Sequence, residues 1–286
     1  MSLEVLELDL ELLRSWYRRR PSDAYKNQAG HVAIFAGSLG YTGAAALAAE
    51  AALSAGAGLV SLHVDAGIYA ILATRCPPEI MVHSLPDDFT VTTLSTVLAD
   101  VFAFGPGIGG SPSEAYLEWL QCESRSVVVD ADGLNLMARH LDKRSSIAKA
   151  GPRVLTPHPG ELARLFPEEA QLARRGERAE AITEAFPLTL LFKGEKTLIT
   201  QRGEPTRMNT TGNPGMATGG MGDVLTGIIV ALLAQGYEPN RAACLGAWLV
   251  ARAADHAIES GLATHETLRP TTVIQQLAIG FRELGA

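Results

Sequence analysis

Short runs of apolar residues alternate with longer segments of mixed character along most of the chain. The runs show no alternation of polar and apolar positions, so each one indicates a strand that is buried on both faces. The segments between the runs are mostly long enough for a helix. The predicted strands lie at 31–37, 59–64, 79–84, 100–105, 126–130, 153–157 and 188–194. Such strands, alternating with helices, predict a mostly parallel central sheet covered on both faces, which is an α/β three-layer αβα architecture.

The two ends of the chain follow other patterns. Residues 1–30 predict an amphipathic helix and then a polar connector. After residue 194 the pattern indicates short, partly antiparallel strands, a glycine-rich loop and C-terminal helices. These strands are expected at 196–203 and 205–210, and the helices near 222–235, 239–259 and 270–283. Because the chain contains no Ser- or Pro-rich linker, we expect one domain over residues 1–286, with residues 1–25 as an N-terminal helical extension.

Composition restricts the class of protein. The 286 residues are 47% hydrophobic, which is enough for a large buried core. A formal net charge of −7 argues against a surface for nucleic acid or an anionic membrane, and no apolar run approaches the roughly 18 residues of a membrane span. The N-terminal acids precede the basic cluster, which is the reverse of a secretory signal. Three widely spaced cysteines, Cys76, Cys122 and Cys244, indicate a reducing cytoplasm and neither a disulfide framework nor a zinc site.

A glycine-dense loop runs into an apolar helix within residues 209–235. Its glycines, among them Gly219, Gly220 and Gly222, let backbone N–H groups face a ligand, and the first N–H groups of a helix have no intrahelical partner. Together with the helix dipole they suit a phosphate or another developing anion. Asp223, at the start of this helix, has two interpretations: an ordinary first-turn acid, or a general base beside a phosphoryl-transfer site.

Polar and glycine-rich residues follow several of the predicted strands. In an open parallel sheet, ligands gather at the carboxyl ends of the strands, so these residues are candidates for a site. They are Gly37-Ser38 with residues 41–44, the loop 105–110, Asp130 with Asp132, residues 156–161 around His158, and residues 192–197 around Lys193.

Three of these groups have ordinary structural explanations as well. Small residues at 37–44 serve close packing of helix on strand as readily as the approach of a flat ligand. Residues 105–110 match G-x-G-x-x-G, but a dinucleotide fingerprint normally opens the first βαβ unit, so a general glycine loop near a ligand is the favoured interpretation. Asp132 serves equally well as a helix cap, whereas Asp130, at the end of its strand, is expected to face the cleft.

The two remaining groups carry His158 and Lys193. Two prolines fix His158 and a helix start just before Glu161, and a rigid, exposed histidine at a strand's end favours contact with a ligand over a place in the core. Glu161 is either a first-turn acid or a residue that holds water on a magnesium ion. Lys193, between a buried run and Gly194, either reaches the phosphates of a nucleotide or belongs to an ordinary hairpin with solvated lysines.

The order of these motifs along the chain adds information that no single motif carries. In sequence they are Gly37-Ser38, YTGA, GPGIG, DADGLN, TPHPGE, LFKGEKT and NPGMATGGMGD. The set resembles the ADP- or ATP-dependent NAD(P)H-hydrate dehydratase family from residue 25 to the C-terminus, and TPHPGE with GMATGGMGD is the most specific part. The resemblance implies a ribokinase-like fold. It also implies a repair reaction in which a nucleotide, ADP giving AMP, drives the loss of water from the S epimer of NADH or NADPH hydrate.

The family resemblance also assigns roles to residues of this chain. It implies that Asp223 takes the proton of the ring hydroxyl, with Gly220 and Gly222 in the catalytic loop whose N–H groups stabilise the transferring phosphoryl. The nucleotide is expected at Lys193, Gly194, Glu195, Lys196, Thr197 and Gly222. The hydrate is expected at Ala44, Gly107, His158 and Asp223. A Mg²⁺ ion is expected to bridge the phosphates, with Glu161 and Asp130 as candidates for holding it through water.

Further implications concern the setting of the enzyme. Family members are often tetramers, so the resemblance implies a cytoplasmic homotetramer that acts on NADHX or NADPHX. The chain has no room for a fused epimerase domain, and this favours ADP over ATP and a separate NAD(P)H-hydrate epimerase. Three other functions stay open: a small-alcohol or vitamin-precursor kinase of the same fold, an NAD-dependent dehydrogenase that uses residues 105–110, and a nucleotide-sensing module without turnover.

Overall fold

The computed structural model describes residues 5–23 and 26–286. In these residues ten strands form one sheet in the order β1-β10-β9-β8-β7-β6-β5-β2-β3-β4. The strands are β1 (Leu6–Glu7), β2 (His31–Phe35), β3 (Leu59–Asp65), β4 (Ile80–Leu85), β5 (Val101–Phe104), β6 (Ser126–Val129), β7 (Arg153–Leu155), β8 (Thr189–Phe192), β9 (Thr197–Gln201) and β10 (Arg207–Asn209). Neighbouring strands from β8 to β4 run parallel, whereas β9 is antiparallel to β8 and β10. The mostly parallel sheet and its predicted strands are confirmed.

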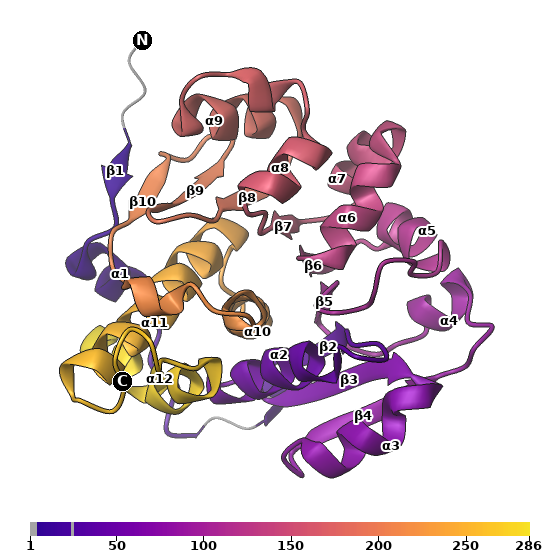
Figure 1. Ribbon diagram of the computed structural model, residues 1–286, viewed down its shortest axis with the longest axis horizontal. Helices are drawn as coiled ribbons and strands as arrows, with labels where there is room; N and C mark the ends of the chain where they lie inside the picture. Colours follow the sequence, from indigo (N-terminus) through magenta and orange to yellow (C-terminus); the bar gives the residue numbers. More distant parts are fainter. Residues whose placement is uncertain (1–4, 24–25) are drawn as a thin grey trace.

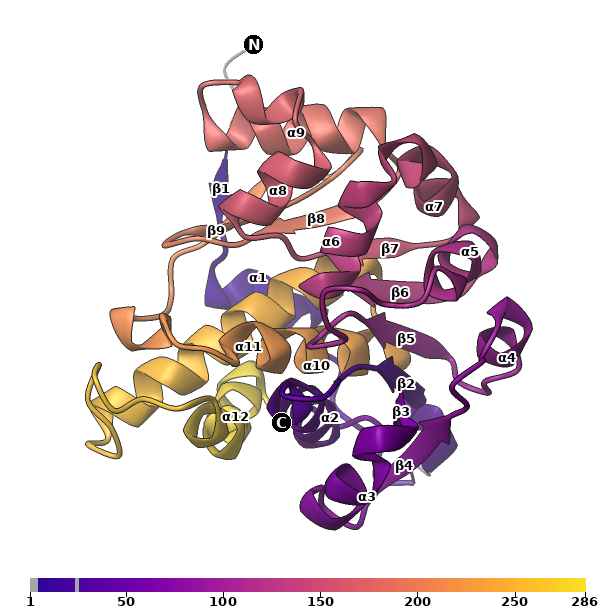
Figure 2. The same cartoon turned by 45° about the vertical axis from the view of Figure 1, so that its right-hand side comes forward.

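Helices cover both faces of this sheet (Figure 1). They are α1 (Leu10–Trp16), α2 (Thr42–Ser54), α3 (Ala66–Arg75), α4 (Val91–Ser95), α5 (Ala115–Cys122), α6 (Asp132–Arg139), α7 (Arg144–Ala150), α8 (Pro159–Leu165), α9 (Arg175–Ala185), α10 (Met221–Ala234), α11 (Pro239–Glu259) and α12 (Pro270–Leu284), and the described residues also form four short 3₁₀ turns. Figure 2 shows α10 and α11 on one side of the strands and α5 to α8 on the other. No helix in the described part of the chain is long and apolar enough to span a membrane.

Two hydrophobic cores account for the absence of polar alternation in the strands. Side chains of successive strand residues point to opposite faces, so Val32 and Ile34 of β2 pack with α2 and α10, whereas Ala33 and Phe35 pack under α5. Both faces of the central strands are therefore buried, and a run of consecutive apolar residues is what such a strand requires.

Helices α2 and α10 approach each other closely on one face. The alanine-rich side of α2 presents Ala48, Ala51 and Ala52 to α10, and a Cβ on Gly227 of α10 would overlap the carbonyl oxygen of Ala48. Helix α10 is also tied to the end of β6, because Thr226 Oγ1 donates a hydrogen bond of 2.8 Å to Asp130 Oδ2. These contacts hold the N-terminus of α10 at the carboxyl ends of the central strands.

The N-terminal segment differs from the predicted helix over residues 1–30. Helix α1 is short, and it begins where the Asp9 carboxylate accepts a hydrogen bond from the backbone N–H of Leu12. The residues before it form β1, which pairs in parallel with β10. The backbone groups of this segment find partners at the otherwise open edge of β10, and that edge is not visible in the local sequence. Residues 1–4 and 24–25 of the predicted extension lie outside the described residues.

Candidate functional site

Strands β6 and β8 end at an ion pair between a buried aspartate and a partly buried lysine. Asp130, which follows β6, is 1% exposed, and its Oδ1 lies 2.8 Å from Nζ of Lys193, which follows β8. Burial opposes the charged form of Lys193, but the carboxylates of Asp130 and Glu161 raise its pKa, so the ammonium stays charged. Lys193 is thus not a solvated hairpin lysine, which was one of the two interpretations from sequence.

The first turn of α10 passes directly beside this ion pair. Its cap residue, Gly220, has a left-handed backbone with φ of 97°, and no side chain of the described residues caps the helix. A Cβ built on Gly222 would lie 3.5 Å from both Asp130 Oδ2 and Lys193 Nζ. The free N–H groups of a helix N-terminus and a lysine ammonium therefore meet at one place, which is an arrangement suited to phosphate.

Asp223 stands in the same turn. Burial, followed by repulsion from Asp130, raises its pKa to about 7, although Lys193 acts in the opposite direction. A carboxylate with such a pKa accepts and releases a proton at neutral pH, which is the property of a general base. An ordinary exposed first-turn acid keeps a pKa near its usual 3.8. The environment of Asp223 therefore favours the base interpretation.

A pocket of about 690 Å³ opens beside the first turn of α10. One part is polar and comes from the turn between β8 and β9, and another is apolar and comes from Met221, Leu225 and the side of α11 around Val250. This volume lies in the usual range for small-molecule sites. The pocket brings together every residue predicted to hold the nucleotide, namely Lys193, Gly194, Glu195, Lys196, Thr197 and Gly222.

Arg175 of α9 holds this turn in place, and sequence reasoning missed it. Its guanidinium donates hydrogen bonds to the carbonyls of Phe192 and Lys193, both 3.1 Å, and of Lys196, 2.9 Å. It also lies 4.5 Å from the centre of the Phe192 ring. A Cβ on Gly194 would lie 2.5 Å from Arg175 Nη2, so a larger residue at this position would require the guanidinium to move. No local motif marks Arg175, because its helix is separate from the turn in sequence.

The loops after β2 and β5 meet at two of the residues predicted to contact the hydrate. Gly107 has a φ of 63°, and a Cβ there would lie 2.9 Å from the Cβ atoms of both Ala44 and Tyr41. Ser38 Oγ donates a hydrogen bond of 2.9 Å to the Gly107 carbonyl. Ala44 and Gly107 are thus neighbours, and Tyr41 beside them is 58% exposed.

His158 forms the N-terminal cap of α8. Its Nδ1 accepts hydrogen bonds from the N–H groups of Gly160, 3.0 Å, and Glu161, 3.4 Å, while Glu161 Oε2 accepts one of 2.8 Å from the His158 N–H. This acceptor role puts the proton of the neutral ring on Nε2. The His158 side chain is 52% exposed, in agreement with the prediction of a rigid, exposed histidine.

The two acids predicted near magnesium are already engaged. Asp130 accepts from Lys193 and Thr226, and the buried Glu161 accepts from the His158 backbone and lies 3.9 Å from Lys193 Nζ. Within residues 5–23 and 26–286, no group of three or more His, Cys, Asp or Glu is placed to hold a metal. Mg²⁺ usually keeps several waters and binds through phosphates with one or two carboxylates. These acids therefore fit only a contact through water to an ion that a nucleotide brings.

The G-x-G-x-x-G loop does not open a helix. Residues 105–110 follow β5, but α5 begins only at Ala115. The Gly109 N–H donates a hydrogen bond of 3.0 Å to the Asp132 carboxylate, so Asp132 ties this loop to α6, whose own cap residue is Ala131. Since no helix N-terminus follows the glycines directly, the loop lacks the pyrophosphate site of a dinucleotide fingerprint.

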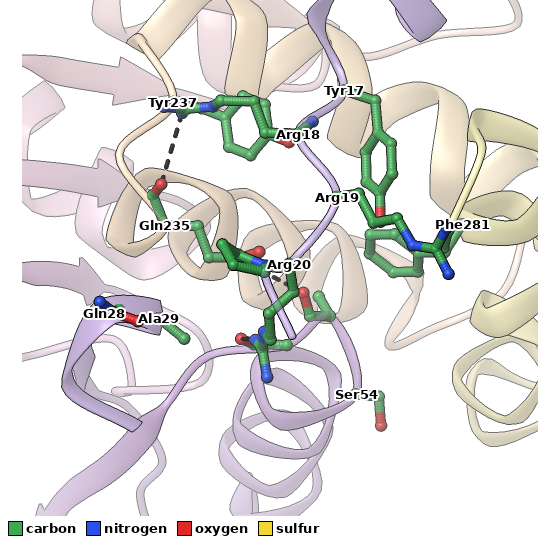
Figure 3. A pocket seen from close by; sticks show the side chains of 14 residues that line it. Tyr17, Arg18, Arg19, Arg20, Gln28, Ala29, Ser54, Gln235, Tyr237 and Phe281 are labelled. Atoms are coloured by element: carbon green, nitrogen blue, oxygen red, sulfur yellow. Dashed lines mark hydrogen bonds between the residues drawn. The ribbon is translucent and has the colours of Figure 1, made fainter. Parts of the chain in front are cut away.

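A second pocket, of about 650 Å³, lies near the amino ends of β2 and β3, and Figure 3 shows the side chains that line it. It is lined by the segment after α1 and by the ends of α2, α10 and α12. Its arginines serve helix ends: Arg18 Nη2 donates to the Gln235 carbonyl at 3.4 Å, and Arg20 donates to the carbonyl of Gly56. Arg18 also lies 4.3 Å from the centre of the Tyr237 ring. These contacts fasten the N-terminal segment to the fold, away from the candidate site.

Known proteins share both the sequence and the fold of this chain. A family model described as NAD(P)H-hydrate dehydratase matches residues 32–277. The ADP-dependent (S)-NAD(P)H-hydrate dehydratase of Neisseria meningitidis is 37% identical over 251 residues, which are 85% of this chain and 82% of that protein. The bifunctional NAD(P)H-hydrate repair enzyme Nnr of Moorella thermoacetica is 44% identical over 259 residues, which are 85% of this chain and 48% of that protein. This chain spans about half the length of such bifunctional relatives.

Two solved structures agree with the predicted ribokinase-like fold. A ribokinase-like superfamily protein from Enterococcus faecalis superposes with a TM-score of 0.80 at 28% identity, over 98% of this chain and 96% of that chain. The ADP/ATP-dependent NAD(P)H-hydrate dehydratase of Bacillus subtilis, co-crystallised with ATP/Mg²⁺, superposes with a TM-score of 0.82 at 23% identity. The superposition covers 99% of this chain and 100% of that chain. The fold is confirmed, and since the family model covers most of the sequence, the chain belongs to the NAD(P)H-hydrate dehydratase family.

Proposed function

We propose that this chain uses a nucleotide, by preference ADP, to dehydrate the S epimer of NADH or NADPH hydrate and so regenerate the normal cofactor. The observation that carries the proposal is the position of Asp223 in the first turn of α10, beside the ion pair of Asp130 and Lys193, where burial and then repulsion from Asp130 raise its pKa to about 7. Hydroxide is a poor leaving group from the hydrated ring, so a site that phosphorylates this hydroxyl is sufficient. The name of the N. meningitidis relative supports the same reaction.

The proposed reaction has two steps. The hydroxyl oxygen of the hydrate attacks the terminal phosphorus of ADP, Asp223 accepts the hydroxyl proton, and the bond to AMP breaks. The backbone N–H groups of residues 219–222 and the Lys193 ammonium balance the charge of the transferring phosphoryl. The ring nitrogen lone pair then expels phosphate from the ring carbon, and loss of a proton from the neighbouring carbon restores the double bond. The products are NAD(P)H, phosphate and AMP.

The two substrates would occupy adjoining places. The pocket of about 690 Å³ would hold the nucleotide, with its base against the apolar side and its phosphates at the start of α10. Ala44, Gly107 and His158 would contact the hydrate. Mg²⁺ would enter with the nucleotide and neutralise phosphate charge, with Asp130 and Glu161 holding its water.

The proposal includes a cellular setting. We expect a cytoplasmic homotetramer that works with an NAD(P)H-hydrate epimerase. The free thiols of Cys76, Cys122 and Cys244 support a reducing compartment. Light scattering on the purified chain checks the assembly, because a tetramer has four times the monomer mass of 30.3 kDa. A monomer at micromolar concentration would contradict it.

A hydrate assay tests both the reaction and the donor. Purified protein is incubated with freshly hydrated NADH and either ADP or ATP, and the absorbance of reduced nicotinamide is followed. We expect it to return with ADP, with one AMP formed for each NADH. A stable phosphorylated product would indicate a small-alcohol kinase. Hydride transfer without nucleotide would indicate a dehydrogenase, and tight nucleotide binding without turnover would indicate a nucleotide-sensing module.

Replacement of Gly219 by alanine tests the role of the loop backbone. A Cβ at this exposed glycine meets nothing within 4 Å, so Gly219→Ala is expected to keep the melting temperature within about 2 °C and to lower kcat by about tenfold or more, because the methyl group intrudes where the phosphoryl passes. Gly67→Ala on α3 is the matched control, since a Cβ there also meets nothing. Equal activity of the two variants would show that the backbone at Gly219 has no role in the phosphoryl transfer.

A further inference from the structure

A small polar cavity lies on the same edge of the sheet as the candidate site. Its volume is about 110 Å³, and it is formed by the ends of β2 and β3, the loop after β5 and the start of α5. Its polar side chains are His63, Asp65, Ser111, Ser113 and Tyr116. At about 30 Å³ for each water molecule, the cavity has room for roughly three or four waters. It therefore suits a small group such as a pair of hydroxyls.

The cavity offers hydrogen-bonding groups and a carboxylate. His63 is 9% exposed, its Nε2 has no hydrogen-bond partner among the described residues, and burial lowers its pKa to about 4, so the ring is neutral. Burial and then the charge of Asp65 raise the pKa of Tyr116, which keeps its hydroxyl proton. Burial and then the charge of Asp87 raise the pKa of Asp65, so the carboxyl group of Asp87 lies near that of Asp65. No Lys or Arg of the described chain lines the cavity.

The cavity and Asp130, which lies beside Asp223, are at the same edge of the sheet, at the ends of β3 and β6. In the sheet, β3 is three strands from β6, and a spacing of about 4.8 Å between strands gives a separation of about 14 Å. Gly37 and Ile108 line the cavity next to the contact of Gly107 with Ala44, so the proposed hydrate position lies between the two. To reach the cavity, a dinucleotide with its nicotinamide ring at Asp223 has to extend its other nucleoside across the loop at Gly107.

That other nucleoside is where the two candidate substrates differ. NADH hydrate carries a 2′-hydroxyl on its adenosine ribose, whereas NADPH hydrate carries a 2′-phosphate. A carboxylate accepts hydrogen bonds from ribose hydroxyls. A phosphate would instead bring about two negative charges close to Asp65 and Asp87, and no Lys or Arg among the described residues lines the cavity to pair with it. Rejection of one substrate by like charge is a common basis of specificity.

We propose that Asp65 and this cavity bind the adenosine ribose hydroxyls of the substrate and make the chain selective for NADH hydrate over NADPH hydrate. The inference rests on the proposed function, because it places the dinucleotide on this edge of the sheet. Asp65 is a specificity residue in this proposal, and it takes no part in the phosphoryl transfer.

The ratio of kcat/KM for the two hydrates tests the proposal. We expect the unmodified chain to favour NADH hydrate by about tenfold or more. Asp65→Ser is expected to bring the ratio close to one, and Asp65→Arg to reverse it, since arginine pairs with phosphate. Asp88→Ser is the matched control, because Asp88 is exposed nearby and does not line the cavity. It should keep the original ratio.

Binding of the products separates this inference from the proposed function. Dissociation constants for NADH and NADPH, taken from nicotinamide fluorescence, report the subsite without any turnover. Failure to dehydrate either hydrate would refute the proposed function, while the affinity ratio would still decide the role of Asp65. A ratio near one in the unmodified chain, or one that Asp65→Ser leaves unchanged, overturns the inference. If Asp65→Ser does not fold, Asp65→Asn keeps the size of the side chain and tests the charge alone.

Discussion

Asp223→Asn is expected to lower turnover of the hydrate by on the order of 10² or more and to leave the fold intact. The amide keeps the shape of the carboxyl group but cannot accept the hydroxyl proton. The measurement is kcat in the hydrate assay, together with circular dichroism as a check of folding. Asp142→Asn is the control, because its side chain is 73% exposed and remote from the site, and it should change neither quantity. Near-normal repair by Asp223→Asn would refute the proposed mechanism.

The same substitution is expected to raise stability at neutral and alkaline pH. The folded state raises the pKa of Asp223 from 3.8 to about 7, so between these values it binds the proton more tightly than the unfolded chain does. The contribution of Asp223 to stability therefore falls as pH rises through this window, and above about pH 7 the partly buried carboxylate costs roughly a few kcal/mol. The gain in melting temperature for Asp223→Asn should grow from pH 5 to pH 8. A difference that is independent of pH would mean that Asp223 titrates normally.

Activity should follow the same titration. A general base works only when it is ionised, so kcat/KM of the unmodified chain is expected to rise as pH increases through about 7 and then to level off. A profile that is flat from pH 5 to pH 8 would argue against Asp223 as the base.

Lys193→Met is expected to weaken both the fold and the site. Removal of the ammonium leaves the carboxylate of Asp130, 1% exposed, without its ionic partner, and breaking one side of a buried pair costs about 3 kcal/mol. Nucleotide affinity should fall as well, because a positive charge beside the phosphates is lost. Lys193 also lowers the pKa of Asp223, so the pH at half-maximal activity should move upward in the variant.

Lys196→Met separates these effects. Lys196 is exposed in the same turn, so its loss is expected to weaken nucleotide binding without a change in melting temperature or in the pH midpoint. Denaturant titration, nucleotide binding and the pH profile of kcat/KM provide the three measurements. If Lys193→Met were as stable as Lys196→Met, the ion pair of Lys193 with Asp130 would contribute nothing to the free energy of unfolding.

The central strands of the sheet could be predicted because the feature that determines them, a run of consecutive apolar residues, lies within each strand's own sequence. A strand that is buried on both faces must be apolar throughout, and this gave the positions of the central strands, while the parallel arrangement placed Asp130, His158 and Lys193 at one edge. Strand β1 was not predictable, because its only reason to be a strand is an edge contributed by residues about 200 positions later. Local propensity cannot report such a partner.

The chemistry of the site divides in the same way. Residue types and their order pointed to Asp223 and the glycine loop, and the structure places them beside Lys193. The raised pKa of Asp223 and the hold of Arg175 on the turn depend on burial and on contacts between distant segments, which no motif encodes. The catalytic and binding roles, the single domain and the tetramer stay predictions.

The close approach of α2 and α10 has a consequence for alignment of the two reactants. Ala44 lies at the start of α2 and Asp223 at the start of α10, and the backbones of the two helices come close together where Gly227 faces the carbonyl oxygen of Ala48. In the proposed reaction, the hydrate at Ala44 and the base Asp223 are therefore held by two helices that pack tightly at a point away from the reacting groups. A larger residue at Gly227 would shift α10 relative to α2. A displacement of about 1 Å between reacting groups can lower the rate about a hundredfold. The alignment of the hydrate with Asp223 in the proposed reaction therefore limits which residues can replace Gly227 and Ala48.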